Sequence, residues 1–213
     1  MSFDLSAQLD PARCALLVFE CQQGVIGADG FLPGLSRAVA EGHVVEHIAT
    51  LIASGREAGV PVVHCSVRKR ADGLGNPFNT PLEMRMRAAQ PSAGVPQPGP
   101  IVPELAPAAQ DIVVERAHGL TGFYESGLDP YLRNMGVRSV VLTGVSVNIG
   151  ILATAIEAVN RGYSVVVPTD CVAGDPPAYA EQALRYAVRN VALLSTLDEI
   201  RRVWNDLATT ARR

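Results

Sequence analysis

The fold is decided by a stretch in the second half of the chain, Ser139-Val140-Val141-Leu142-Thr143-Gly144-Val145-Ser146-Val147-Asn148-Ile149-Gly150. Its first five residues form an apolar run of strand length, and a glycine-containing turn follows. From about Asn148 to Arg161 the apolar residues recur at helical spacing, and Gly162 supplies the stop signal. Another apolar run occupies residues 163–167. The order strand, helix, strand predicts a right-handed crossover between two parallel strands.

The same alternation extends over the rest of the chain. Further apolar runs of strand length lie at residues 14–19, 60–65, 111–114 and 192–194. Helical spacing is found at residues 38–58, at 177–189 and from Thr196 or Leu197 onward. In the helix that begins at Asn148, the positions predicted to face the core are Leu152, Ala155, Ile156 and Val159. These patterns predict a single α/β domain over residues 1–213, with six parallel strands between two layers of helices.

Composition excludes several classes of protein. The 213 residues are 48% hydrophobic and 18% charged, which is typical of one globular domain. The formal charge of -3 and the pI near 5.8 argue against nucleic acid as a partner, since no basic stripe is present. No apolar run approaches the roughly 18 residues of a membrane span, and no secretory leader is recognisable. We therefore expect a cytoplasmic protein that does not bind a membrane.

The cysteines and histidines give no metal or disulfide pattern. The four cysteines are widely spaced, so we interpret them as reduced thiols: Cys14, Cys21, Cys65 and Cys171. His43 and His47 are four residues apart on a predicted helix, but no third ligand is evident. The sequence also lacks GxGxxG and GxxxxGK, so no nucleotide is indicated. We expect neither a metal nor a cofactor.

Residues 67–110 form the least regular part of the chain. Prolines and glycines are frequent there, and at most a short helix is predicted around residues 82–89. A long excursion inside a compact domain is more often a loop that covers a site than filler. We therefore expect part of it to lie over a ligand.

Candidate site residues follow the predicted strands, because ligands of open parallel sheets bind beyond the carboxyl ends of the strands. Glu20 follows the first strand, His118 follows the third, and residues 146–150 follow the fourth. A carboxylate placed directly after an apolar strand is costly to bury unless it is paired or protonated. The backbone N–H groups of residues 146–150 precede a helix, where they could bind a developing oxyanion.

Four segments together resemble the isochorismatase-like (cysteine hydrolase) superfamily. They are residues 15–20 (ALLVFE), 59–63 (GVPVV), 142–148 (LTGVSVN) and 161–167 (RGYSVVV). The resemblance spans nearly the whole chain and implies a sheet of strand order 3-2-1-4-5-6. It also implies a homodimer or homotetramer, a cis peptide between Val145 and Ser146, and a site that uses Asp, Lys and Cys.

Matching the family residue by residue changes this expected site. The family's Asp falls on Glu20, and its nucleophilic Cys falls on Gly150. Its Lys, counted six positions before the aromatic that Phe123 matches, falls on Ala117. Without a thiolate no acyl-enzyme can form, so the amide-hydrolysing chemistry of the cysteine members is close to excluded. Members that resemble true isochorismatases also have Gly at the Cys position, although they keep the Asp and the Lys.

The first hypothesis is a small-molecule hydrolase that acts without a cysteine nucleophile. Glu20 would be the general acid or base, His118 would orient a water, and the N–H groups around Gly150 would bind negative charge. Without a lysine at position 117, a desolvated Glu20 is expected to hold a proton near neutral pH. Arg116 and His118 flank position 117, and their roles stay open.

Other residues are candidates for substrate binding. Ser146 and Asn148 lie in the turn after the fourth strand, Phe123 is a candidate pocket wall, and Arg70 could meet an anionic substrate. Asn148 is equally explained as a helix cap, and Arg70 as a solvated loop charge.

A second hypothesis is a catalytically silent protein that keeps the fold and binds a small molecule. Two of the three expected catalytic groups are missing, and a fold does not guarantee a function. A closed pocket surrounded by Glu20, His118 and the amides of residues 146–150 would favour chemistry. A Glu20 that is locked to a core partner, with no cavity reaching it, would favour binding or scaffolding.

Overall fold

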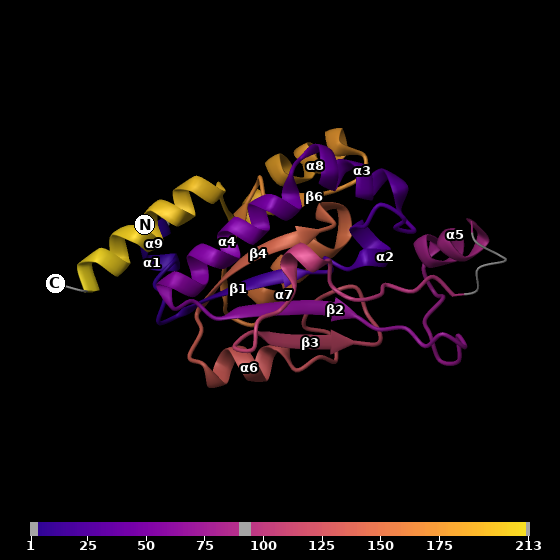
Figure 1. The fold of residues 1–213 in the computed structure, drawn as a ribbon, viewed down its shortest axis with the longest axis horizontal. Coiled ribbons are helices and arrows are strands. Elements are labelled where there is room, and N and C mark those ends of the chain that lie inside the picture. Colours follow the sequence, from indigo (N-terminus) through magenta and orange to yellow (C-terminus); the bar gives the residue numbers. More distant parts are fainter. Residues whose placement is uncertain (1–3, 90–94, 212–213) are drawn as a thin grey trace.

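The strands lie side by side in the order β3-β2-β1-β4-β5-β7, and the short β6 pairs with β4. Figure 1 shows β3, β2, β1 and β4 in this sequence. The computed structural model describes residues 4–89 and 95–211. Every pairing between these strands is parallel, which confirms the predicted sheet and its order. The additional strand β6 is only two residues long, too short for a periodicity to reveal. The strands are β1 Cys14–Phe19, β2 Val62–Val67, β3 Ile112–Arg116, β4 Ser139–Val145, β5 Ser164–Pro168, β6 Val172–Ala173 and β7 Leu193–Ser195.

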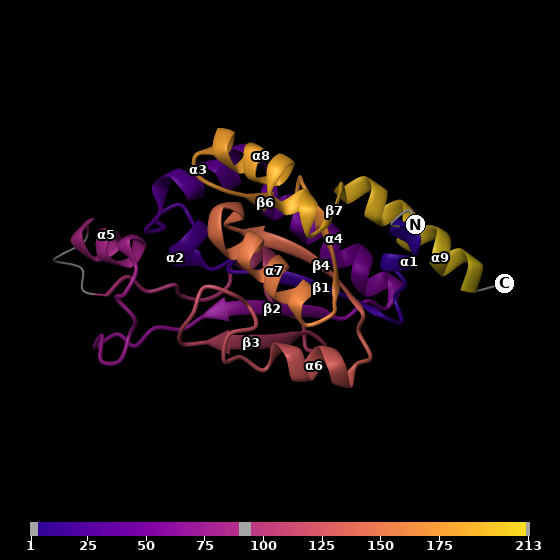
Figure 2. The same ribbon diagram turned by 180° about the vertical axis from the view of Figure 1, so that it is seen from behind.

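Helices cover both faces of the sheet (Figures 1 and 2). Alternate side chains of β1 enter two separate cores, with Leu16 and Val18 on the side of α4 and α9, and Leu17 and Phe19 on the side of α6 and α7. None of the helices in the described residues combines the length and the apolar surface that a bilayer crossing requires. The helices are α1 Leu5–Gln8, α2 Gln23–Ile26, α3 Pro33–Glu41, α4 Val44–Ala58, α5 Pro81–Ala89, α6 Leu128–Asn134, α7 Leu152–Asn160, α8 Pro177–Tyr186 and α9 Leu197–Ala211.

Two predicted helices differ from the structure. The helix expected at 38–58 is split into α3 and α4, because Gly42 ends the first and His43 adopts a left-handed conformation with φ 51°. The helix expected from Asn148 begins with a π-helical turn, Val147–Ile151, and becomes α-helical only in α7. A π turn adds one residue, which rotates all later positions about the helix axis.

This rotation corrects the predicted buried face of α7. Ala155 is buried as expected, but Ile156 and Val159 are 43% and 42% exposed. The small residues Thr154 and Ala158 pack inward instead. A count of apolar spacing cannot detect a one-residue insertion at the start of a helix.

The excursion after β2 returns to the carboxyl edge of the sheet. Gln22, just after β1, donates to the Val67 and Gly99 carbonyls at 2.9 and 2.7 Å, and its Oε1 accepts from the Val67 N–H at 2.8 Å. The two ends of the excursion are thus tied to β1 by one buried amide. Figures 1 and 2 show α5 beyond the tips of β2 and β3, apart from the helices that cover the sheet.

Candidate functional site

A small cavity lies at the carboxyl ends of β1 and β3, beneath α5. Its volume is about 100 Å³, and we call it the Glu20 pocket. Its walls are apolar side chains of α5 and of the segments before α3 and after β2. Its ionisable lining residues are Glu20, Lys69, Glu83, Arg116 and His118.

A larger, more open hollow of about 550 Å³ lies elsewhere, between α2, α4 and residues 102–104. It carries the acidic side chains of Asp29, Glu46 and Glu104 but no cationic group. The Glu20 pocket is the better candidate, since it lies at the strand ends and encloses ionisable groups of both signs.

Glu20 and Arg116 form an ion pair at the base of the Glu20 pocket. Arg116 is the last residue of β3, and its side chain is 3% exposed. Its Nη2 donates to Glu20 Oε1, and its Nε donates to the Gly119 carbonyl at 3.3 Å. The guanidinium carbon lies 5.0 Å from the centre of the Phe19 ring. Arg116 Nη1 is buried and has no hydrogen-bond partner among the described residues.

This pair corrects the expectation that Glu20 has no cationic neighbour. The spacing from Phe123 selected Ala117, whereas the cation is supplied one residue earlier, at Arg116. A guanidinium partner favours the ionised form of a carboxylate. The premise that Glu20 lacks a cationic neighbour is therefore wrong.

His118 lines the same pocket at its exposed rim. Its ring lies edge-on to that of Tyr124, with 5.5 Å between the centroids. The turn that carries His118 needs glycine at the next position, because Gly119 has φ 83° and a Cβ there would approach the Tyr124 ring to 2.5 Å. The structure thus brings the two predicted residues, Glu20 and His118, to one cavity.

Position 150 has no room for a thiol. A Cβ on Gly150 would come within 2.5 Å of Cε1 of Phe19, whose ring is fully buried. All four cysteines are also buried, and none lines the Glu20 pocket. Burial raises the thiol pKa of Cys14, Cys21 and Cys65 to about 12, and it also raises that of Cys171. No thiolate is therefore available at this pocket.

The turn after β4 does not line the Glu20 pocket. The peptide between Val145 and Ser146 is cis, as the family resemblance implied. The Ser146 carbonyl accepts from the N–H groups of Ile149 and Ile151 within the π turn. Asn148 is bound to the backbone of Asp175 through both its amide nitrogen, at 2.7 Å, and its amide oxygen, at 3.0 Å. Residues 146–150 are not part of the pocket lining, so the predicted oxyanion donors do not face Glu20.

Two predicted substrate-binding residues also lie elsewhere. Phe123 is 3% exposed and stacks on Tyr163 in the core, with 5.9 Å between the ring centroids. Arg70 is exposed and pairs with Asp72 at 2.5 Å in a surface loop. Neither residue lines the Glu20 pocket.

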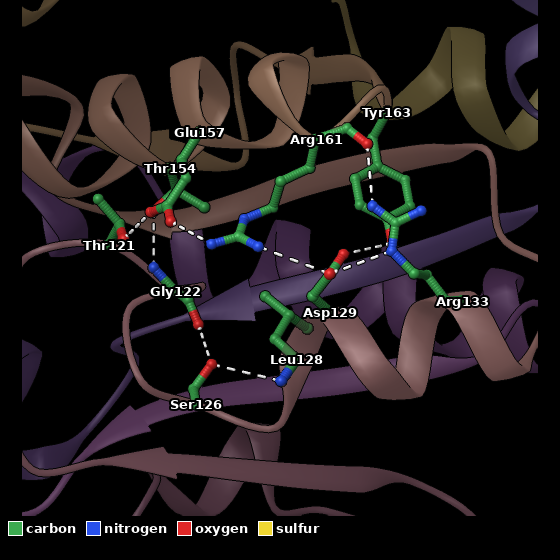
Figure 3. A network of polar contacts seen from close by, with 10 residues as sticks. All are labelled: Thr121, Gly122, Ser126, Leu128, Asp129, Arg133, Thr154, Glu157, Arg161 and Tyr163. Carbon is green, nitrogen blue, oxygen red and sulfur yellow. Dashed lines mark hydrogen bonds and ion pairs between the residues drawn. The ribbon is translucent and has the colours of Figure 1, made fainter.

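A polar network fixes the segment between His118 and α6 (Figure 3). Asp129 accepts from Tyr163 Oη at 2.8 Å and from Arg133 Nε at 3.1 Å. Glu157 accepts from Arg161 Nη2 at 2.8 Å and from the Thr121 hydroxyl. We call this set the Asp129 network, formed by Thr121, Asp129, Arg133, Glu157, Arg161 and Tyr163.

The network has the electrostatics of a structural cluster. Burial alone would raise the pKa of Asp129, but hydrogen bonds from Tyr163 and Arg133 outweigh it and hold that pKa below its usual value. Burial, and then the hydrogen bond to Asp129, raises the pKa of Tyr163 to about 12. Asp129 thus stays ionised and Tyr163 protonated over the physiological range, and the network anchors the loop that carries His118.

Sequence reasoning missed Lys69 and Glu83. Their side chains are 10% and 11% exposed, and Lys69 Nζ lies 3.6 Å from Glu83 Oε1 inside the Glu20 pocket. One signal was present, because Lys69 is the only lysine among the 18 Lys and Arg residues of the chain. Among the described residues, no group of three or more His, Cys, Asp and Glu side chains is arranged to hold a metal.

Comparison with known proteins identifies the family. Residues 14–199 match the model of the isochorismatase domain. The chain belongs to the isochorismatase family. A maleamate amidohydrolase of Pseudomonas putida is 31% identical over 164 residues, which cover 74% of this chain and 71% of that protein. A ureidoacrylate amidohydrolase of Pseudomonas syringae pv. syringae is 28% identical over 194 residues, or 85% of this chain and 79% of that protein.

Solved structures show the same fold. The N-carbamoylsarcosine amidase of Thermoplasma acidophilum has a TM-score of 0.67 and 26% identity, covering 87% of this chain and 97% of that one. A cysteine hydrolase of Pseudomonas syringae pv. phaseolicola has a TM-score of 0.75 at 21% identity, covering 94% of this chain and 96% of that one. Of these proteins, the two curated relatives are amidohydrolases and the Thermoplasma acidophilum protein is an amidase.

Proposed function

We propose that this isochorismatase family member is a small-molecule hydrolase that activates water with Glu20 and forms no covalent thiol intermediate. One contrast carries the proposal. Position 150 holds a glycine packed against Phe19, with neither a thiol nor space for one, whereas the Glu20 carboxylate lines a pocket beside a buried guanidinium. Family membership supplies the reaction class, and the pocket supplies the acid–base group.

The ion pair supports the role of general base for Glu20. In the proposed reaction, Glu20 takes a proton from a water, and the water oxygen forms a bond to a carbonyl carbon of the substrate. The bond from that carbon to the leaving nitrogen or oxygen then breaks, and Glu20 returns the proton to the leaving group. One water is consumed, and a carboxylic acid and an amine or alcohol are released.

Arg116 has two tasks in this scheme. Its Nη2 holds Glu20 in place, and its Nη1, which is buried without a partner among the described residues, is the donor that we propose for the carbonyl oxygen that becomes negative. A buried donor of this kind stabilises an oxyanion more strongly than water does. His118, at the rim, is positioned to orient the attacking water.

The substrate type follows from the same geometry. Hydrolysis of an enol ether begins with protonation by an acid, which a carboxylate paired with arginine is poorly suited to supply. Attack of water on a carbonyl carbon needs a base instead. The amidohydrolase relatives are consistent with an acyl substrate, so small amides and esters come first.

A panel of small amides, esters and enol ethers tests this function. We expect wild-type protein to hydrolyse an amide or ester, and Glu20→Gln to lose about 10²–10⁴ of that rate. Glu115→Gln is the matched control, because Glu115 is exposed on β3 and pairs with Arg68; it should keep the wild-type rate. Full turnover by Glu20→Gln would overturn the assignment of the base. Binding of a panel member by a wild-type protein that hydrolyses none would instead support the silent binding protein.

A further inference from the structure

The most unusual group in the Glu20 pocket is the ammonium of Lys69. The side chain is nine-tenths buried, and its nearest charged partner, Glu83 Oε1, lies 3.6 Å away. Within residues 4–89 and 95–211 its Nζ makes no hydrogen bond, although an ammonium has three donors to satisfy. Because its nearest charged partner lies beyond hydrogen-bond distance, the ammonium is able to take an anion as a closer partner.

Glu83 belongs to α5, the helix beyond the tips of β2 and β3. It is the third residue of α5, and it is hydrogen-bonded twice to the side chain of Thr80, the residue before the helix: its N–H donates to Thr80 Oγ1 at 3.2 Å, and its Oε2 accepts from that hydroxyl at 3.1 Å. The carboxylate of Glu83 is therefore shared between the helix cap and Lys69. It faces Lys69 without reaching it.

The Glu20 pocket contains two cation–carboxylate pairs, and they differ in kind. Arg116 is hydrogen-bonded to Glu20, whereas Lys69 is only near Glu83. If an anion from a ligand replaced Glu83 at Lys69, the ammonium would gain the hydrogen bonds that it lacks. The other pair would be left intact to perform hydrolysis.

We propose that Lys69 is the anion subsite of this pocket, and that the substrate is a small acyl compound carrying a carboxylate. The carboxylate binds Lys69, the acyl group lies at Glu20 and Arg116, and Glu83 takes the place of the carboxylate when the site is empty. This inference rests on the proposed function for the reaction, but the anion subsite itself is tested without turnover. The cavity of about 100 Å³ limits a fully enclosed ligand to roughly four or five non-hydrogen atoms, since a 150 Å³ cavity holds the six carbons of benzene.

Propionate and propionamide form a matched pair of probes, with equal size and different charge. Because Lys69 is the only lysine, protein labelled with ¹³C at lysine Cε gives one lysine signal in NMR spectra. We expect propionate to shift this signal in a saturable way, with a Kd about 10 to 100 times lower than that of propionamide, as for hydrogen bonds to a charged group.

Three variants complete the test by calorimetric titration with propionate. Lys69→Met should remove the preference for propionate over propionamide. Glu83→Gln keeps a capping residue but removes the competing charge, so it should bind propionate about 3 to 10 times more tightly. Arg68→Met, next in sequence and exposed, is the control and should leave the propionate Kd unchanged.

The result that overturns the inference is equal affinity for the two probes, or a propionate Kd that Lys69→Met leaves unchanged. If Lys69→Met does not fold, the Glu83→Gln variant decides, since an unchanged or weaker propionate affinity contradicts the exchange at Lys69. If wild-type protein hydrolyses no member of the panel but binds propionate as expected, the anion subsite is supported and only the proposed catalytic function is contradicted.

Discussion

Two charge clusters of this protein differ in how completely they are satisfied. In the Asp129 network, Asp129 accepts hydrogen bonds from two residues, and Arg161 binds Glu157 and Asp129 through its terminal nitrogens, while its Nε has no partner among the described residues. In the Glu20 pocket, Arg116 Nη1 has no partner within that same part of the chain, and Lys69 only approaches Glu83. In the first cluster, both terminal nitrogens of the arginine are thus bound to carboxylates. The second has donors to spare next to a cavity, which is typical of a site that binds something.

The largest expected difference between the clusters is in activity, and two arginine variants measure it. Arg116→Met removes the donor to the reacting oxygen and the partner of Glu20, so we expect kcat/KM to fall at least about 100-fold. Arg161→Met should lower the free energy of unfolding by about 1–3 kcal/mol and keep the rate per folded molecule within about twofold. Steady-state kinetics and urea unfolding of both variants provide the comparison. Equal losses of kcat/KM in Arg116→Met and Arg161→Met would contradict the functional distinction between the two clusters.

A thiol placed at position 150 should harm stability and create no activity. In Gly150→Cys the new Cβ collides with the Phe19 ring, and overpacking of this kind costs about 1–3 kcal/mol. Phe19→Leu combined with Gly150→Cys should recover part of that loss, because the two positions are in contact. Urea unfolding measures both effects. A faster rate or an acyl-enzyme mass in Gly150→Cys alone would show that the position remains competent for thiol chemistry.

Asp129 offers a pH-dependent test of the Asp129 network. Its pKa is held below the usual value in the folded protein, so the ionised form stabilises the fold above about pH 4, and this contribution is lost as the pH falls through the folded pKa. Asp129→Asn should therefore be less stable than wild type by about 1–2 kcal/mol at pH 7 and nearly equal to it at the lowest pH. Urea unfolding between pH 7 and 3 measures this gap. A gap that does not narrow on acidification contradicts the role of the ionised carboxylate.

The smallest expected effect concerns His64, a buried residue of β2 that lines neither the Glu20 pocket nor the larger hollow. Neither ring nitrogen has a hydrogen-bond partner among the described residues, and Nε2 lies 3.5 Å from Asp111, which is itself paired with Arg56. Burial lowers the pKa of His64, and this effect outweighs the attraction of Asp111. The neutral ring therefore supports the fold above about pH 6.5, and the support is lost as the pH falls through the folded pKa.

His64→Leu tests whether unsatisfied polar groups by themselves mark a site. Between pH 7.5 and 5, the Tm of wild type should fall more than that of His64→Leu, and kcat at pH 7.5 should be unchanged. Thermal unfolding at the two pH values and one kinetic assay are sufficient. A lower kcat in His64→Leu would mean that an unpartnered polar group matters even without an adjoining cavity.

The sequence predicted the sheet better than it predicted the site, for physical reasons. Strand periodicity is local, so the apolar run of β1 gave its bounds correctly, Cys14–Phe19. The buried face of α7 was wrong because a π turn shifts the register, which no apolar pattern records. Glu20 and His118 were predicted to share one edge because parallel strands bring their carboxyl ends together.

The charges of the site were harder to predict than its position. A count from Phe123 placed the cation at Ala117, but the side chain that reaches Glu20 comes from Arg116. Lys69 and Glu83 meet only because the excursion folds back over the sheet edge, a tertiary event without a local signature. The single lysine of the chain was the available clue.

Two adjacent residues allow the central claim, carboxylate rather than thiol catalysis, to be tested most directly. Glu20 lines the pocket, whereas Cys21, the next residue, is buried with its thiol pKa raised to about 12 by burial. We predict that Glu20→Gln loses about 10²–10⁴ in kcat on the best substrate of the panel, while Cys21→Ala stays within about threefold of wild type. A Cys21→Ala variant that loses activity while Glu20→Gln retains it would contradict a thiol-free mechanism based on Glu20.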